Sequence, residues 1–190
     1  FFISDHPLNQ FKEIFDDYKI VDYVKFNLDD NIKNANIAAT LLKITERKTA
    51  KGSSYGVIKF TDLTSVFELF IFSDILELNR EALVEGSSLI ITLTKTISND
   101  ENRFKRINVQ KIASLKDLFN KPINEITFNI KSDKDLNKIS ELASKGGTTE
   151  VKLNINDKNK DISFKLKNKR FIDRKAVNIL RNNDILAIIN

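Results

Sequence analysis

Apolar and polar positions alternate in five segments between residues 36 and 113, and this pattern predicts five short strands. Polar segments separate most of them: residues 48–53 form a basic loop and residues 63–65 a tight turn. Residues 73–84 have helical spacing and stand between the third and fourth strands. The predicted strands cover residues 36–47, 55–62, 66–72, 88–97 and 103–112.

Three strands, a helix and two further strands form the element order of an OB-fold, a small Greek-key barrel. This fold commonly binds oligonucleotides on the face of its second and third strands and on the adjoining loops. Residues 35–115 are therefore expected to form a five-stranded OB-fold barrel, and this organisation favours a binding module over a catalyst.

A helical lead-in is expected before the barrel and a second domain after it. Ser4 precedes His6 and Pro7 as a helix start, and apolar residues then recur at helical spacing over residues 8–15. Residues 116–122 form a linker that ends at a proline. The expected fold class is thus β-rich plus α+β: a helical lead-in (1–34), the OB-fold barrel, and a small α+β C-terminal domain (123–190).

Inside the second domain, a strand is predicted at 124–131 and a helix at 132–144, which Gly146-Gly147 would stop. A hairpin is expected around residues 156–160, and Asp173 caps a final helix. Residues 185–189 are apolar, and this segment either completes the core or contacts a partner.

The composition excludes several kinds of site and segment. The chain has no cysteine, which excludes disulfides and thiolate metal sites and suits a reducing cytoplasm. It begins with Phe1 and has no methionine, so we expect a piece of a longer protein. No apolar run approaches the roughly 20 residues of a spanning helix, so no membrane partner is expected.

The net charge of +5 is unevenly distributed. Residues 1–34 hold 4 basic and 7 acidic residues, whereas residues 121–190 hold 15 and 9. A basic excess fits nucleic-acid contact. A composition rich in Lys, Asn and Ile, as an AT-rich genome produces, explains it equally well, so the positions of the charges have to decide.

The alternation assigns a candidate nucleic-acid face to the second and third strands. Small and apolar residues point inward in this phase: Gly56, Ile58, Phe60, Phe67, Leu69 and Ile71. Aromatic and basic residues then point outward or flank the strands: Arg47, Lys48, Lys51, Tyr55, Lys59 and Phe70. Aromatic rings stack bases and cations follow phosphates. The phase depends on register, since one β-bulge reverses it. In the alternative, Phe70 and Phe72 pack against a neighbouring domain.

A second group of cations lies around the turn between the fourth and fifth strands, which often lines the ligand groove of an OB-fold. It comprises Lys95, Arg103, Lys105 and Arg106, which would extend the basic track. The alternative is an exposed, solvated hairpin.

No catalytic or metal-ligating residue is predicted. The pairs Asp16-Asp17 and Asp29-Asp30 suit helix ends and turns, because sequence neighbours point in different directions. His6 is the only histidine and is expected to be structural. Neither a phosphate-binding glycine loop nor a GxSxG or HExxH motif occurs, and no cofactor is expected in this chain.

Two segments carry a family resemblance. The run Phe2-Ile3-Ser4-Asp5-His6-Pro7-Leu8 is similar to the segment that precedes the OB domain in the alpha subunit of bacterial DNA polymerase III. Residues 47–72, with Arg47-Lys48-Thr49, Tyr55-Gly56-Val57-Ile58-Lys59-Phe60, Asp62 and Phe67-Glu68-Leu69-Phe70-Ile71-Phe72, resemble the barrel of that family. The chain departs from the family at two places. Ser65 stands where the family usually has a glycine, in the turn after the second strand, and Ser53-Ser54 stand where acidic or proline residues often follow the loop glycine.

The resemblance implies a parent that is a bacterial, cytoplasmic DNA-directed DNA polymerase using dNTPs and Mg²⁺, with its catalytic carboxylates upstream. It implies that the OB domain contacts single-stranded template through Arg47, Lys48, Lys51, Tyr55 and Lys59. It also implies that the C-terminal domain binds the tau subunit of the clamp loader, and that the sliding clamp and a proofreading subunit are partners of the parent. No clamp-binding peptide is identified in the chain.

Two other classes of function remain open. The barrel could be a docking module without DNA contact, which predicts salt-insensitive binding of a protein partner. An anticodon-binding OB domain of a tRNA synthetase is disfavoured, because it explains neither the His-Pro-Leu lead-in nor the C-terminal unit.

Overall fold

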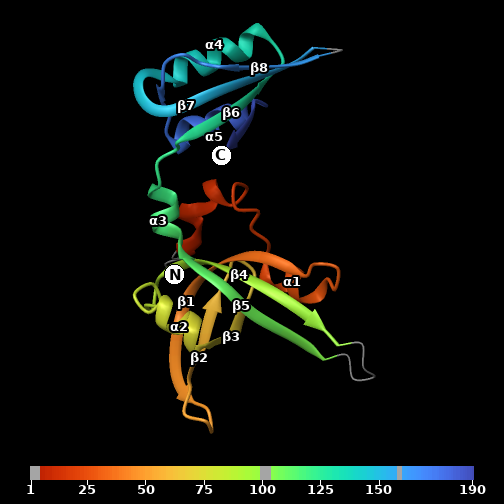
Figure 1. Ribbon diagram of the computed structural model, residues 1–190, viewed down its shortest axis with the longest axis vertical. Helices are drawn as coiled ribbons and strands as arrows, with labels where there is room; N and C mark the ends of the chain where they lie inside the picture. Colours follow the sequence, from red (N-terminus) through yellow and green to blue (C-terminus); the bar gives the residue numbers. More distant parts are fainter. Residues whose placement is uncertain (1–4, 99–103, 158–159) are drawn as a thin grey trace. The chain divides into compact units, whose positions relative to one another are not determined.

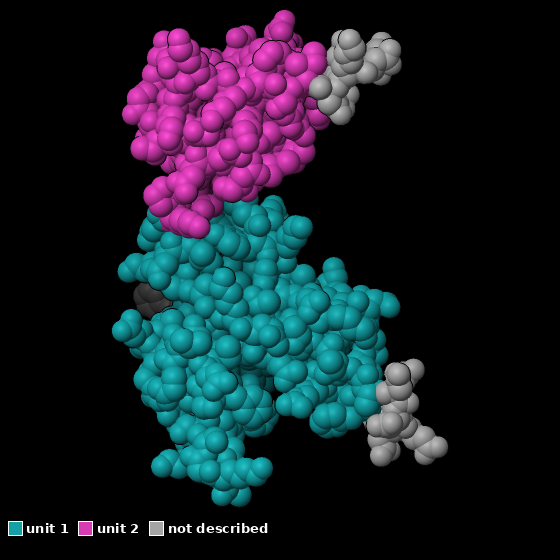
Figure 2. All heavy atoms as spheres, in the orientation of Figure 1, with its two compact units in different colours: residues 1–120 teal, residues 121–190 magenta. Residues whose placement is uncertain are grey.

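The computed structural model describes residues 5–98, 104–157 and 160–190. The chain divides into two compact units, Phe1–Asn120 and Lys121–Asn190 (Figure 2). Among the residues described, no helix is long and apolar enough to cross a membrane.

The first unit contains a five-stranded antiparallel sheet in the order β3-β2-β1-β4-β5 (Figure 1). Residues of β3 and β5, the two outer strands, contact each other, so the sheet curls into a barrel. The predicted OB-fold is confirmed by this order. Its strands are β1 (Asn34–Lys48), β2 (Ser54–Thr61), β3 (Val66–Phe72), β4 (Ser88–Ile97) and β5 (Lys105–Ser114).

A β-bulge divides the long strand β1 into two parts. Residues 34–40 pair with β4, and residues 40–48, which include the bulge, pair with β2. Leu41 lies opposite Phe60 but Lys43 lies opposite Lys59, so Leu42 has no partner in the register. An extra residue reverses the side-chain phase, because neighbours along a strand point to opposite faces. The bulge therefore turns Lys43 to the outside of the barrel.

The inward phase predicted for β2 and β3 is confirmed. All six residues expected to point inward are buried, and all of them except Gly56 join one core with residues of β1 and β4. The helix α2 (Ser73–Leu78) adds Leu76 to this core. It is shorter than the predicted helix over 73–84: the side chain of Asn79 donates to the carbonyl of Ile75 and a turn follows.

The lead-in folds onto the outer side of the barrel. The segment η1 (Pro7–Ile14) is a 3-10 helix, and the N-H of Leu8 donates to Nδ1 of His6, so the histidine caps the helix. Ser4, the expected start, lies outside the described residues. Apolar residues of η1 pack with those of β1, β4 and α3 (Leu115–Asn120): Leu8, Phe11, Ile14, Ala38, Ile90 and Leu115. The lead-in thus covers the first half of β1 and leaves the second half open.

The second unit is a sheet with two helices on one face. The strand order is β10-β6-β7-β8. The strands β6 and β7 are parallel, and the helix α4 forms the crossover connection that parallel neighbours require. Residues of α4 and α5 share one core with the sheet. The elements are β6 (Glu125–Ile130), α4 (Asp133–Leu142), β7 (Ser144–Asp157), β8 (Lys160–Lys165), β9 (Arg170–Phe171), α5 (Arg174–Asn182) and β10 (Leu186–Ile189).

The apolar C-terminal segment is both core and surface. Ile185 and Ala187 are buried, whereas Leu186 and Ile188 are about half exposed. A strand at the edge of a sheet produces this alternation.

Gly146 and Gly147 do not stop the helix as predicted. The helix α4 ends at Leu142, and both glycines lie within β7. A Cβ on Gly147 would lie 2.1 Å from the carbonyl oxygen of Arg170, so this glycine allows β9 to approach the backbone of β7.

Candidate nucleic-acid interface

The second half of β1, together with β2 and β3, presents one outward surface, which we call the β1–β3 face. Cross-strand pairing arranges it in three rows: Lys43 beside Lys59 and Glu68, Thr45 beside Val57 and Phe70, and Arg47 beside Tyr55 and Phe72.

Three aromatic residues form the centre and one end of this face. Phe70 and Phe72 are 56% and 51% exposed. Tyr55 is half-buried, and its ring centre lies 6.4 Å from that of Phe70 at an angle of 33°. Large apolar rings held open to solvent on a rigid sheet are suitable platforms for base stacking.

Cations border the aromatic residues on the β1 side. Arg47, Lys48 and Lys51 are all exposed. The loop from β1 to β2, which projects from the barrel in Figure 1, is held by a hydrogen bond of 2.9 Å from the N-H of Gly52 to the carbonyl of Thr49. Gly52 has a φ of 84°, a left-handed conformation that glycine adopts without strain. The structure thus brings together the cations and aromatic residues predicted for this face.

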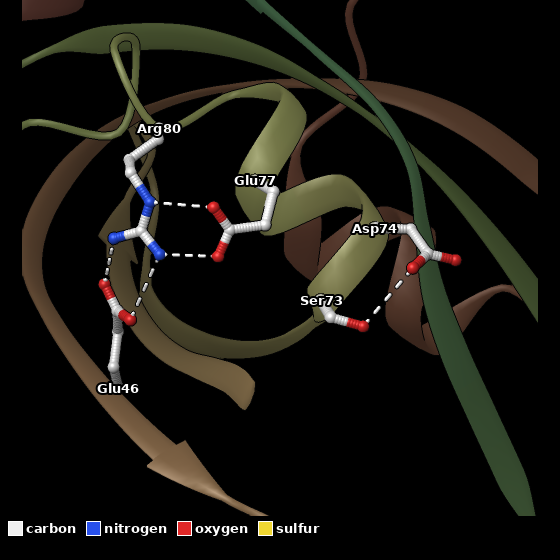
Figure 3. Close-up of polar contacts among 5 residues, drawn as sticks. All are labelled: Glu46, Ser73, Asp74, Glu77 and Arg80. Atoms are coloured by element: carbon white, nitrogen blue, oxygen red, sulfur yellow. Dashed lines mark hydrogen bonds and ion pairs between the residues drawn. The ribbon is translucent and has the colours of Figure 1, made fainter. Parts of the chain in front are cut away.

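An ion-pair cluster anchors the end of β1 beside these cations (Figure 3). The guanidinium of Arg80 donates to Glu46 at 2.7 Å and to Glu77 at 2.6 Å. The hydrogen bonds that Arg80 donates to the carboxylates of Glu77 and Glu46 raise the pKa of Arg80, and the bond to Arg80 lowers the pKa of Glu77. Because Glu46 is engaged in this way, its charge is partly compensated where it adjoins Arg47.

Lys95 is not part of any exposed basic track, which corrects its prediction as a nucleic-acid contact. Its side chain is fully buried beneath the helix α1 (Tyr23–Leu28). The ammonium donates to the carbonyl oxygens of Phe26 at 2.5 Å and Asp29 at 2.8 Å. Burial lowers the pKa of Lys95, and Lys105 lowers it further, while Asp30 opposes the change. The lysine therefore fastens the end of α1 to β4.

The other cations of the β4–β5 hairpin are separated from one another. Lys105 turns toward the lead-in, where it forms an ion pair with Asp30 at 2.6 Å. Arg106, the next residue on the strand, points to the opposite side and donates to the side chain of Asn108 at 3.2 Å. Arg103 lies outside the described residues. The continuous track expected from these residues is therefore not present in the part of the hairpin that the structure describes.

Asp62, which the resemblance included, is structural. Its carboxylate is buried and accepts backbone N-H groups from Tyr23 at 2.8 Å, Thr64 at 2.8 Å and Ser65 at 2.7 Å. Burial raises the pKa of Asp62, but these hydrogen bonds outweigh it, so its pKa is below the usual value. Ser65 has no positive φ and donates its hydroxyl to Asp62 as well, so this turn does not need a glycine.

Two exposed residues of unit 1 were missed by the sequence reasoning. Lys43 belongs to the β1–β3 face because of the bulge, and the change of the inward apolar positions from Leu41 to Ile44 was the available signal. Phe104, directly before β5, is 67% exposed, and its N-H donates to the hydroxyl of Ser98. An aromatic residue directly before two basic residues, Lys105 and Arg106, was the sequence signal that could have identified it.

The described ranges contain no group of three or more His, Cys, Asp or Glu residues placed to hold a metal ion.

Comparison with known proteins identifies relatives for most of the chain. It is 29% identical over 140 residues to DNA polymerase III subunit alpha of Rickettsia conorii and to that of Rickettsia felis, and 29% identical over 145 residues to that of Rickettsia bellii. The chain is similar to part of DNA polymerase III subunit alpha. This confirms the resemblance described from the sequence. The matches cover 73–75% of the chain but only 11–12% of the length of these relatives.

No protein-family model matches the chain. Among solved structures, a chain of a replication protein A heterotrimer bound to single-stranded DNA is similar, with 13% sequence identity and a TM-score of 0.38. The alignment covers 76% of the present chain and 37% of the replication protein A chain. A likeness of this degree does not assign a function, and the OB-fold is assigned from the strand order.

Proposed function

We propose that the barrel binds single-stranded DNA on the β1–β3 face and thereby guides the template of a replicative polymerase. The observation that carries this proposal is the placement of exposed Phe70 and Phe72 opposite the cations of β1 on a single rigid sheet. The similarity to DNA polymerase III subunit alpha supports DNA as the ligand.

The arrangement suits a single strand better than a duplex. Bases that stack on aromatic rings have to be unpaired, and each such contact contributes about 1–3 kcal/mol whatever the base. Each phosphate neutralised by a lysine or arginine adds about 0.7 to the slope of log affinity against log salt. Binding is therefore expected to be tolerant of sequence and strongly dependent on salt.

The remaining parts of the proposal concern the parent protein. Similarity to the alpha subunit supports a DNA-directed DNA polymerase that uses dNTPs and Mg²⁺, with its reaction carried out by residues other than those of this chain. The described unit 2, an α+β fold after an OB-fold barrel, fits the position of a domain that couples the polymerase to the tau subunit of the clamp loader. Titrating the chain with purified tau subunit tests this coupling separately from DNA binding.

Fluorescence anisotropy of labelled single-stranded DNA tests the binding function. The chain is titrated at 50 and 200 mM salt, beside a Lys48→Ala/Lys51→Ala/Tyr55→Ala variant. Binding that weakens with salt and is lost in the variant supports the proposal. No binding at low salt would contradict it.

The exposed phenylalanines also favour a second candidate, a docking module for another protein. An apolar docking site predicts binding that is insensitive to salt, whereas phosphate contacts predict the opposite. In the DNA titration, salt-sensitive binding supports the first function, and no binding at low salt favours the docking module.

A further inference from the structure

Charge and aromaticity are segregated across the three strands of the β1–β3 face. After the bulge, the outward side of β1 carries Lys43, Thr45 and Arg47, with Lys48 at its end, and no aromatic residue. The strand β3 carries outward Phe70 and Phe72 but no lysine or arginine. The outward residues of β2 lie between them and are mixed: Tyr55, Val57 and Lys59.

The positions of two acidic side chains add to this separation of charge. Glu68 is exposed on β3 and lies directly opposite Lys59 in the register. A carboxylate at this position disfavours a phosphate over β3 by like-charge repulsion. On the β1 side, Glu46 points away from the face and binds Arg80 (Figure 3), so it does not oppose a phosphate there in the same way.

The spacing of the strands matches the dimensions of a nucleotide. Neighbouring strands are about 4.8 Å apart, so the cations of β1 and the rings of β3 are separated by roughly 10 Å. This separation is comparable with the reach from a phosphate across the sugar to the outer part of a base.

We propose that bound single-stranded DNA lies along the β1–β3 face with its phosphates over β1 and its bases over β3, and that Lys43 is a phosphate contact. This inference rests on the proposed function and adds the lateral orientation of the strand. The bulge at Leu42 is the structural reason for it, since an unbroken strand would have turned Lys43 into the barrel.

Two oligonucleotides of equal length and charge test the orientation: one intact, and one that lacks the bases of its central nucleotides. Lys43→Ala is expected to weaken binding of both by the same factor and to lower the salt slope by about 0.7. Phe70→Ala is expected to weaken binding of the intact strand roughly 5- to 100-fold, with an unchanged salt slope and little effect on the strand that lacks bases. Lys111→Ala, at an exposed lysine of β5, and Phe171→Ala, at an exposed phenylalanine of the second unit, are the matched controls.

Glu68→Gln provides an independent measurement. Removing this charge is expected to strengthen binding roughly two- to fivefold at low salt, and the gain should vanish at high salt. Glu81→Gln, an exposed carboxylate elsewhere in the first unit, is the control.

The outcomes distinguish the orientation from the function. If the unaltered chain binds the intact strand but Phe70→Ala weakens both oligonucleotides equally, or Lys43→Ala leaves the salt slope unchanged, the orientation is overturned and DNA binding stands. If the unaltered chain binds neither oligonucleotide at low salt, the proposed function and the orientation both fail.

Discussion

The ammonium of Lys95 lies 2.5 Å from the carbonyl oxygen of Phe26 and 4.9 Å from the centre of its ring. A buried lysine is costly unless its charge is met by hydrogen bonds. Here backbone carbonyls at the end of α1 meet it, so one side chain joins the lead-in to β4.

Replacing Lys95 with methionine should lower the free energy of unfolding of the barrel by about 1–3 kcal/mol, because the carbonyls of Phe26 and Asp29 lose their donor in a buried place. Urea unfolding followed by tyrosine fluorescence measures this, since all three tyrosines lie in the first unit. Lys111→Met, at an exposed position, should stay within about 0.5 kcal/mol of the parent. Equal effects of the two substitutions would argue against the fastening role.

Replacing Asp62 with asparagine should lower the free energy of unfolding at neutral pH by about 2–3 kcal/mol, because the buried acceptor loses its charge. The pKa of Asp62 is below its ordinary 3.8 in the folded state, so the unfolded state binds more protons in acid. The stability from Asp62 is thus complete above the ordinary value and is lost as the pH falls through the lower folded pKa.

Unfolding of the two proteins at a series of pH values checks this. The gap between parent and Asp62→Asn should be widest above pH ~4 and should close at lower pH. A gap of constant size down to the most acidic stable condition would contradict the assignment.

Replacing Gly147 with alanine should destabilise the second unit by about 3 kcal/mol or more, because the new methyl group meets the backbone of Arg170 and Phe171. Gly146→Ala has open space around it and should cost only about 1 kcal/mol, from its φ of 89°. Hydrogen exchange of the β6 and β7 amides measures both. The prediction fails if the two variants exchange alike.

Lys48 and Lys105 should differ in their effect on DNA affinity although both are exposed lysines at the ends of strands. Lys48→Ala should weaken binding and lower the salt slope by about 0.7, because it removes one phosphate contact. Lys105 is held by Asp30, so Lys105→Ala should change the slope much less. Anisotropy titrations at four salt concentrations compare them, and a larger change for Lys105 would contradict the assigned face.

The sequence by itself determined the barrel and the phase of its central strands. Alternation along β2 and β3 separates apolar from polar positions with a period of two, and burial of the apolar set leaves only one choice of face. Tyr55, Lys59 and Phe70 could be placed outward for this reason.

Only the tertiary structure decided the positions of Lys43 and Lys95. The bulge in β1 is fixed by how that strand pairs with both β2 and β4. Lys95 follows Leu89, Ile91 and Leu93 on the inward face of β4, and only its charge predicts exposure; α1 folds over it and supplies carbonyl partners. Register and burial beneath a distant segment are long-range properties, whereas alternation is local, and this is why the sequence determined the faces of the sheet but not the full membership of the site.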